Sequence, residues 1–143
     1  HYPLRRQRQM CIRDSTENKN TVTVLSAMVE DPTGYGRIIR DADGNFVKSV
    51  EHKDASEEER ASHEINSGMY IFNSEALSAS LDLLSNDNAA GEYYLTDTIA
   101  LIKKIGLKVS ALPLTGDACD EIRGVNTIDQ LEEAEQIMCH RED

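Results

Sequence analysis

At 143 residues the chain is long enough for one ordinary domain with a hydrophobic core, and no longer. Its 26 acidic and 15 basic side chains give a formal net charge of −11 at pH 7, which argues against a protein that neutralises nucleic-acid phosphates or binds an anionic membrane surface. Its 3 cysteines are widely spaced and no apolar run could span a membrane, so we expect a reducing cytoplasm and neither a disulfide framework nor a cysteine metal site.

The N-terminal segment contrasts with the rest of the chain. Residues 1–15, HYPLRRQRQMCIRDS, are basic and lack apolar periodicity, whereas the remainder is acidic. We therefore expect residues 1–18 to be a leader that is foreign to the domain or disordered; a genuine basic tail is the alternative. The domain is expected over residues 19–138 and a tail over residues 139–143.

A strand followed by a glycine loop comes next. Residues 21–29 combine β-branched side chains with a continuous apolar run, which predicts a strand buried on one or both faces. The run ends at Asp31-Pro32, and Gly34 and Gly36 follow. Both glycines permit positive φ, so this loop predicts a backbone that can approach a ligand closely; an ordinary turn is the alternative.

A β-hairpin is predicted around the turn sequence Asp-Ala-Asp-Gly-Asn of residues 41–45, which strand-like runs at 37–40 and 46–51 flank. A calcium loop is the rival interpretation, and the spacing excludes it. Phe46 stands where an EF-hand needs glycine, and His52 stands where it needs a bidentate glutamate.

The middle of the chain predicts a helix and a strand. Residues 54–60 offer an Asp or Ser cap followed by acidic residues, which indicates a short solvated helix. Residues 65–73 then read as a strand, INSGMYIFN. Alternate side chains of this strand are expected on opposite faces, with Met69 and Ile71 on one face and Tyr70 and Phe72 on the other.

The C-terminal third predicts helices with one strand between them. The expected elements are a helix over residues 74–84 capped by Ser74, a helix over 95–105 with Ile99, Ile102 and Ile105 inward, a strand over 108–112, and an amphipathic helix capped by Thr127. This order indicates an α/β fold with a mixed, mostly parallel sheet, flanking helices and the β-hairpin as an insertion.

Five segments of the chain together form a pattern that is specific for one family. They are DPTGYGRIIR, VEHKDASEEER, EINSGMY, NDNAAGEYYLTD and GVN. In this order they resemble the nucleotidyltransferase half of bacterial bifunctional enzymes that are UDP-N-acetylglucosamine pyrophosphorylases and glucosamine-1-phosphate acetyltransferases. The resemblance covers about residues 19–138 and implies part of a doubly wound nucleotide-sugar transferase fold. It implies that UTP and N-acetylglucosamine 1-phosphate are joined into UDP-N-acetylglucosamine and pyrophosphate, with Mg²⁺, for cell-wall precursor synthesis. The parent protein is implied to be a cytoplasmic homotrimer that also acetylates glucosamine 1-phosphate.

The resemblance also implies roles for residues near the glycine loop. Gly36 would offer its backbone to the sugar, and Glu51 would accept hydrogen bonds from sugar hydroxyls. Asn66 would bind the phosphate side of the product, and its neighbour Ser67, which stands where relatives often have threonine, would also bind the substrate.

Further residues are implied by the later segments. Tyr94 and Thr96 would line the acetamido pocket, and Asn126 would be a magnesium ligand. A neutral amide oxygen suits Mg²⁺, which usually adds a carboxylate and phosphate oxygens. Catalysis of this kind depends on positioning and charge stabilisation, so no protein nucleophile is expected.

The chain departs from the family pattern before its first strand. No glycine-rich stretch stands ahead of Thr21, where the resemblance would place a nucleotide loop and an aspartate ligand for the metal. We therefore expect this sequence to be a fragment that is inactive by itself. The alternatives are a pyrophosphorylase of the glucose-1-phosphate type and a non-catalytic module that only binds sugar nucleotides.

Overall fold

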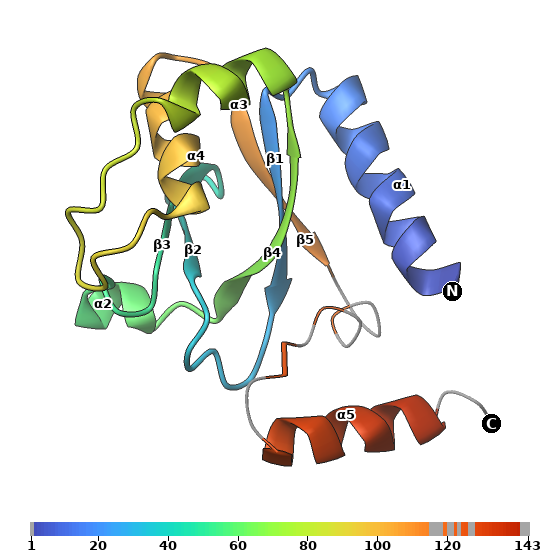
Figure 1. The fold of residues 1–143 in the computed structure, drawn as a ribbon. Coiled ribbons are helices and arrows are strands. Elements are labelled where there is room, and N and C mark those ends of the chain that lie inside the picture. The colour runs from blue at the N-terminus through green and yellow to red at the C-terminus, as the bar shows by residue number, and fades with distance from the viewer. Residues whose placement is uncertain (1, 115–118, 120–121, 123, 126–127, 141–143) are drawn as a thin grey trace.

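The computed structural model describes residues 2–114, 119, 122, 124–125 and 128–140. The strands of its sheet are β1 (Val22–Met28), β2 (Arg37–Arg40), β3 (Phe46–Val50), β4 (Glu64–Phe72) and β5 (Val109–Leu114). The helices are α1 (Tyr2–Glu17), α2 (Glu57–Arg60), α3 (Ser74–Leu81), α4 (Leu95–Lys104) and α5 (Ile128–His140). The strand order is β3-β2-β4-β1-β5 (Figure 1).

The sheet is mixed, as predicted, but antiparallel pairs predominate among the described strands. β4 pairs antiparallel with both β1 and β2, and β2 pairs antiparallel with β3. Only β5 lies parallel to its neighbour β1. The expectation of a mostly parallel sheet was therefore wrong. Connection length accounts for one antiparallel pair, since β2 and β3 are joined by a short turn; β4 instead inserts between β2 and β1 after a longer connection, so its direction is set by long-range pairing.

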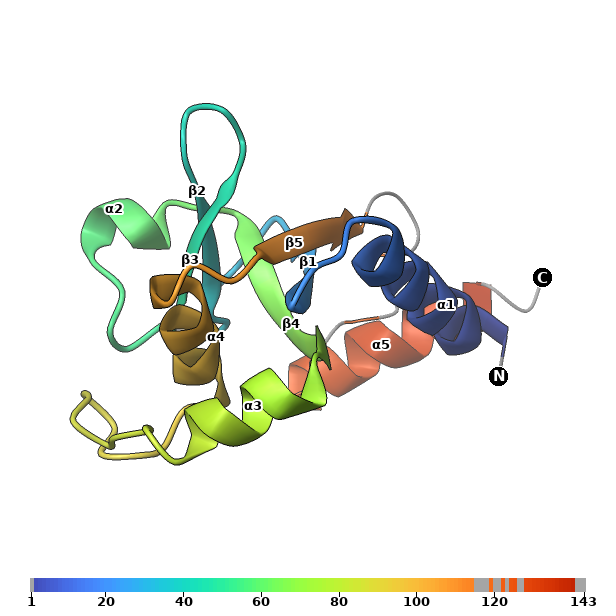
Figure 2. The same ribbon diagram turned by 90° about the horizontal axis from the view of Figure 1, so that it is seen from above.

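Helices cover both faces of this sheet (Figures 1 and 2). Below α3 and α4, Tyr70 and Phe72 of β4 pack on a core cluster that includes Ile99 and Ile102 of α4. On the α1 side, the intervening β4 side chains pack on a second cluster that includes Cys11 and Leu25; these side chains are Met69 and Ile71. The predicted alternation along β4 and the α/β class are both confirmed.

The N-terminal segment differs from the expected disordered leader, because residues 2–17 form helix α1. Cys11 is only 6% exposed and Ser15, four residues later on the same helical face, is 8% exposed. The end of the helix is tied to β5, since Asn20 Nδ2 donates to Ser110 Oγ at 2.7 Å. One buried cysteine and one serine make too weak an apolar stripe for sequence patterns to detect.

Two details of α3 and α4 correct the predicted boundaries. The N-cap of α3 is Asn73 rather than Ser74, because the Asn73 side chain accepts a hydrogen bond from the Ala76 amide. In α4, Ile99 and Ile102 are buried as expected, whereas Ile105 is 72% exposed. Ile105 is the C-cap residue, and so it lies beyond the stripe that faces the sheet.

The remaining helices complete the outline. The predicted solvated helix is α2, whose N-cap Ser56 and Glu59 form a reciprocal capping box. Helix α5 continues to His140, past the expected domain end at residue 138, and its predicted cap Thr127 lies outside the described residues. Across the described part of the chain, every helix is too short or too polar to cross a membrane.

Candidate functional site

The loop between β1 and β2 brings Gly36 against the start of β4. The Gly36 carbonyl accepts a hydrogen bond from the Asn66 amide at 2.9 Å. A Cβ built on Gly36 would lie 3.4 Å from both Glu51 Oε2 and the Val50 carbonyl oxygen, and 3.7 Å from Asn66 Cβ. Gly34 has a positive φ of 82° but Gly36 does not, so Gly36 serves close approach rather than turn geometry.

Glu51 follows β3 directly and has one of its two carboxylate oxygens engaged. Thr96, which is 6% exposed in the first turn of α4, donates its hydroxyl to Glu51 Oε1 at 2.9 Å. The other oxygen, Oε2, faces Gly36 and has no hydrogen-bond donor among the described residues. A carboxylate oxygen in this state can accept a hydrogen bond from a ligand hydroxyl.

Asn66 lies at a β-bulge, where β4 moves from Asn66 to Tyr70 while β1 moves only from Ser26 to Val24. Gly68, inside the bulge, has a φ of 77°. The bulge turns the Gly68 amide onto Asn66 Oδ1 at 3.0 Å. Bulges of this kind commonly re-aim a side chain beside a binding site.

The Asn66 side chain is 8% exposed and is already well bonded within the protein. Its Nδ2 donates to Tyr70 Oη at 2.8 Å and to Ser49 Oγ at 3.2 Å. Both amide protons are therefore used, and a ligand could bond only to the remaining lone pair of Oδ1.

The structure does not bring the Ser67 side chain into the cluster of Gly36, Glu51, Asn66 and Thr96. Its hydroxyl donates to the Leu25 carbonyl at 2.7 Å and accepts from the Met69 amide at 3.2 Å. Ser67 thus fastens the bulge to β1. The structure brings four of the predicted residues together: Asn66 is bonded to Gly36, Thr96 is bonded to Glu51, and Glu51 Oε2 lies beside Gly36.

Tyr94 lies at the edge of the cluster as the N-cap residue of α4. Burial raises the pKa of Tyr94, and the nearby carboxylates of Asp54 and Glu51 raise it further. Burial and the Asp54 charge also raise the pKa of Asp97. The cluster is therefore a region of negative potential, which suits neutral sugar hydroxyls as donors better than it suits a free anion.

Sequence reasoning missed several partners of the predicted residues. Tyr70 bonds to Asn66, and its pKa is raised by burial and by the Glu51 charge while the Asn66 bond lowers it. The alternation along β4 could have revealed Tyr70, because residues 66 and 70 share a face. Asp54 accepts a bond from the Ala89 amide at 2.9 Å across a separation of 35 residues, and no local pattern signals such a contact.

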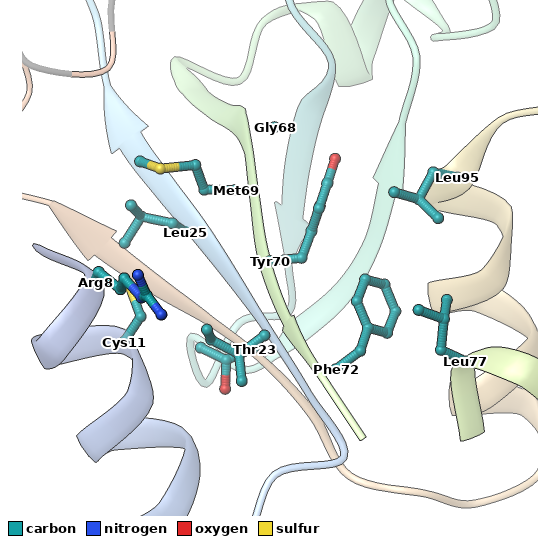
Figure 3. A pocket seen from close by; sticks show the side chains of 11 residues that line it. Arg8, Cys11, Thr23, Leu25, Gly68, Met69, Tyr70, Phe72, Leu77 and Leu95 are labelled. Atoms are coloured by element: carbon teal, nitrogen blue, oxygen red, sulfur yellow. The ribbon is translucent and has the colours of Figure 1, made fainter. Parts of the chain in front are cut away.

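A cavity of about 600 Å³ lies elsewhere on β4, between α1 and the α3–α4 pair (Figure 3). Cys11 and Leu25 line it on one side of β4, and Leu77 and Leu95 line it on the other. This lining is mostly apolar and offers few partners for hydroxyls or phosphate, so we do not place the sugar there. Tyr70 borders both this cavity and the polar cluster.

The implied magnesium ligand Asn126 lies outside the described residues. Within the described part of the chain, no group of three or more histidine, cysteine, aspartate or glutamate side chains could hold a metal ion. We assign no metal contact to the described cluster.

The chain is similar in sequence to several known proteins. The sequence profile of the nucleotidyl transferase family matches residues 5–117. The bifunctional protein GlmU of Caldanaerobacter subterraneus subsp. tengcongensis is 54% identical over 122 residues, which are 85% of this chain and 26% of that protein. The proteins of the same name are 52% identical over 125 residues in Clostridioides difficile (strain 630) and 55% identical over 123 residues in Clostridium botulinum (strain 657 / Type Ba4). The chain thus spans only 26–27% of the length of these curated relatives.

A solved structure shares the fold. It comes from Bacillus anthracis and is described as a glucose-1-phosphate thymidylyltransferase in complex with sucrose. The TM-score is 0.56 at 21% sequence identity, and the match covers 85% of this chain and 51% of that chain. At this identity the likeness concerns the fold alone.

Proposed function

The chain belongs to the nucleotidyl transferase family, and from this premise we propose that it forms the sugar-phosphate side of a UDP-N-acetylglucosamine pyrophosphorylase site. The proposed reaction joins UTP and N-acetylglucosamine 1-phosphate to give UDP-N-acetylglucosamine and pyrophosphate. The observation that carries the proposal is the meeting of Gly36, Glu51, Asn66 and Thr96. The identity of 52–55% to proteins named bifunctional protein GlmU supports the choice of sugar nucleotide.

The chemistry follows from which oxygens are occupied. Thr96 fixes the orientation of the Glu51 carboxylate, and Gly36 leaves space beside Oε2. A sugar hydroxyl that donates to Oε2 completes the bonding of a partly buried carboxylate. A ligand without that hydroxyl leaves the oxygen unpaired, and sites of this type discriminate strongly for that reason.

The reaction itself asks little covalent chemistry of the protein. A phosphate oxygen of the sugar phosphate attacks the α-phosphorus of UTP, and pyrophosphate leaves. The role proposed for these residues is to hold the sugar so that its phosphate is in line for attack. Mg²⁺, which the resemblance implies at Asn126, would offset phosphate charge when bound.

For the whole protein, the proposal extends to a bifunctional enzyme that also acetylates glucosamine 1-phosphate and assembles as a homotrimer in the cytoplasm. The name of the relatives, bifunctional protein GlmU, supports bifunctionality. The fold and motifs of this chain support only the nucleotidyltransferase part.

Titration calorimetry on the 143-residue chain tests the proposal with two sugar nucleotides that differ at one position. We expect saturable binding of UDP-N-acetylglucosamine, and binding of UDP-glucose that is weaker by about tenfold or more, because the acetamido group would lose its contacts near Tyr94. Equal affinity for both ligands would favour the glucose-1-phosphate type. Absence of binding to either would favour an inert module.

A further inference from the structure

Tyr35 makes two reciprocal hydrogen bonds with the backbone of Gly124. Its phenol oxygen donates to the Gly124 carbonyl at 3.2 Å and accepts from the Gly124 amide at 3.0 Å. These bonds join positions 89 residues apart in the sequence. A single side chain therefore satisfies both backbone groups of one residue, which is the pairing that a neighbouring strand would otherwise provide.

The close packing of the tyrosine ring is favoured by the absence of a side chain at Gly124. A Cβ built on Gly124 would lie 3.3 Å from Tyr35 Oη and 3.4 Å from Tyr35 Cε1. Because Gly124 has no side chain, the tyrosine ring can lie directly against its backbone. Gly124 is therefore adapted to this partner by shape as well as by hydrogen bonding.

The backbone of Tyr35 is held as firmly as its phenol. Its amide donates to the Pro32 carbonyl at 3.1 Å, and its carbonyl accepts a hydrogen bond from Arg37 Nη1. Arg37 is 2% exposed, so this bond lies in a largely dry environment where it is costly to break. The next residue, Gly36, carries these restraints directly to Glu51 and Asn66.

We propose that Tyr35 is a positioning residue, which couples the segment at Gly124 to the sugar-binding loop and so holds Gly36 in place against Glu51 and Asn66. The functional part of this inference rests on the proposed sugar-nucleotide site. The hydroxyl rather than the ring carries the coupling, because the ring packs on the second core cluster while the hydroxyl reaches Gly124.

The first test measures amide hydrogen exchange by NMR without any ligand. Tyr35→Phe keeps the ring and removes both bonds to Gly124. We expect exchange about tenfold faster at the Gly124 amide and also faster at the Asn66 amide, which donates to the Gly36 carbonyl. Amides of the β1–β5 pair should keep their rates, since a general loss of stability would raise those as well.

The matched control is Tyr93→Phe, because Tyr93 is 67% exposed and lies outside the cluster. This change should leave both amides unchanged. If Tyr35→Phe accelerates exchange at Gly124 but not at Asn66, the contact is purely local and the inference is overturned. Uniform acceleration across the sheet would also overturn it.

The second test links the contact to ligand binding. In the wild-type chain, UDP-N-acetylglucosamine should shift the Gly124 amide resonance, and Tyr35→Phe should abolish this shift and weaken binding by about tenfold. Persistence of the shift in Tyr35→Phe would contradict the coupling. A wild-type chain that fails to bind the ligand would overturn the proposed function, and the ligand-free exchange test would still decide the role of Tyr35.

Discussion

Two glutamates near the start of β4 are bonded in opposite ways. Glu64 accepts from Ser26 Oγ at 2.6 Å and from Arg40 Nε and Nη2 at 2.7 Å each, so both of its oxygens are occupied. Glu51 has one oxygen bonded to Thr96 and the other directed toward Gly36. Glu64 thus has every carboxylate oxygen paired inside the protein, whereas Glu51 keeps one oxygen without a donor among the described residues, and it is there that we propose a ligand hydroxyl binds.

The saturated pair also explains how the hairpin is attached to the sheet. Arg40, on β2, donates to the Gly44 carbonyl within the hairpin turn at 2.9 Å and to the Ala111 carbonyl of β5 at 3.0 Å. Its ion pair with Glu64 then joins the hairpin to β4. The hydrogen bonds to Glu64, and after them its charge, hold the pKa of Arg40 above its usual range. This network therefore links the hairpin to β4 and β5.

Breaking the ion pair between Arg40 and Glu64 should have the largest effect on stability. Arg40→Met leaves the nearly buried Glu64 carboxylate without its cation, and we expect a loss of about 3 kcal/mol in the free energy of unfolding. Urea denaturation measures this loss. The matched control is Lys48→Met, since the Lys48 side chain in its ion pair with Glu59 is 48% exposed. That change should cost less than about 1 kcal/mol. Equal losses for the two variants would remove the distinction between saturated and solvated pairs.

Changing the half-paired carboxylate should affect binding more than stability. Glu51→Gln keeps an acceptor for Thr96 but removes the charge that a sugar hydroxyl would meet. We expect UDP-N-acetylglucosamine affinity to fall by about tenfold to a hundredfold, with the unfolding free energy within about 1 kcal/mol of wild type.

Calorimetry and urea denaturation on the same preparation separate the two effects. Glu57→Gln, on the exposed face of α2, is the control and should change neither quantity. A Glu51→Gln chain that is destabilised as much as Arg40→Met, with unchanged binding, would show that Glu51 is structural and would refute the comparison.

Around Glu51 and Glu64, the sequence could predict the features that depend on local patterns. The hairpin turn and the alternation along β4 depend on residues close in sequence, and both were predicted correctly. The binding role of Glu51 was predicted through motif resemblance, and it stays a prediction. The Glu64 network was missed because its bonds cross 24 residues to Arg40 and 38 residues to Ser26, and no periodicity encodes such pairings.

Strand direction and helix α1 were missed for related reasons. The direction of β2 relative to β4 depends on which edge the chain returns to, which side-chain patterns do not specify. Among the described side chains of helix α1, only Cys11 and Ser15 are buried, so the basic composition of the segment dominated the prediction. Long-range pairing, rather than local propensity, decided these features.

A third carboxylate, Asp41, tests the smallest effect. Its oxygens accept from the Asn45 amide at 2.8 Å and from Asn45 Nδ2 at 3.1 Å, so it is saturated like Glu64 but lies in an exposed turn. These bonds hold the pKa of Asp41 below its usual range. Because the folded pKa is lowered, the contribution to stability is present above the unfolded pKa of about 3.9 and is lost as pH falls through the folded value.

We expect the melting temperature of wild type to exceed that of Asp41→Ala slightly at about pH 5, and this gap to close toward about pH 2. Asp43→Ala, which leaves the Asp41 bonds intact, is the control. A gap that stayed constant with pH would mean that the charge of the Asp41 carboxylate contributes nothing to the stability of the turn.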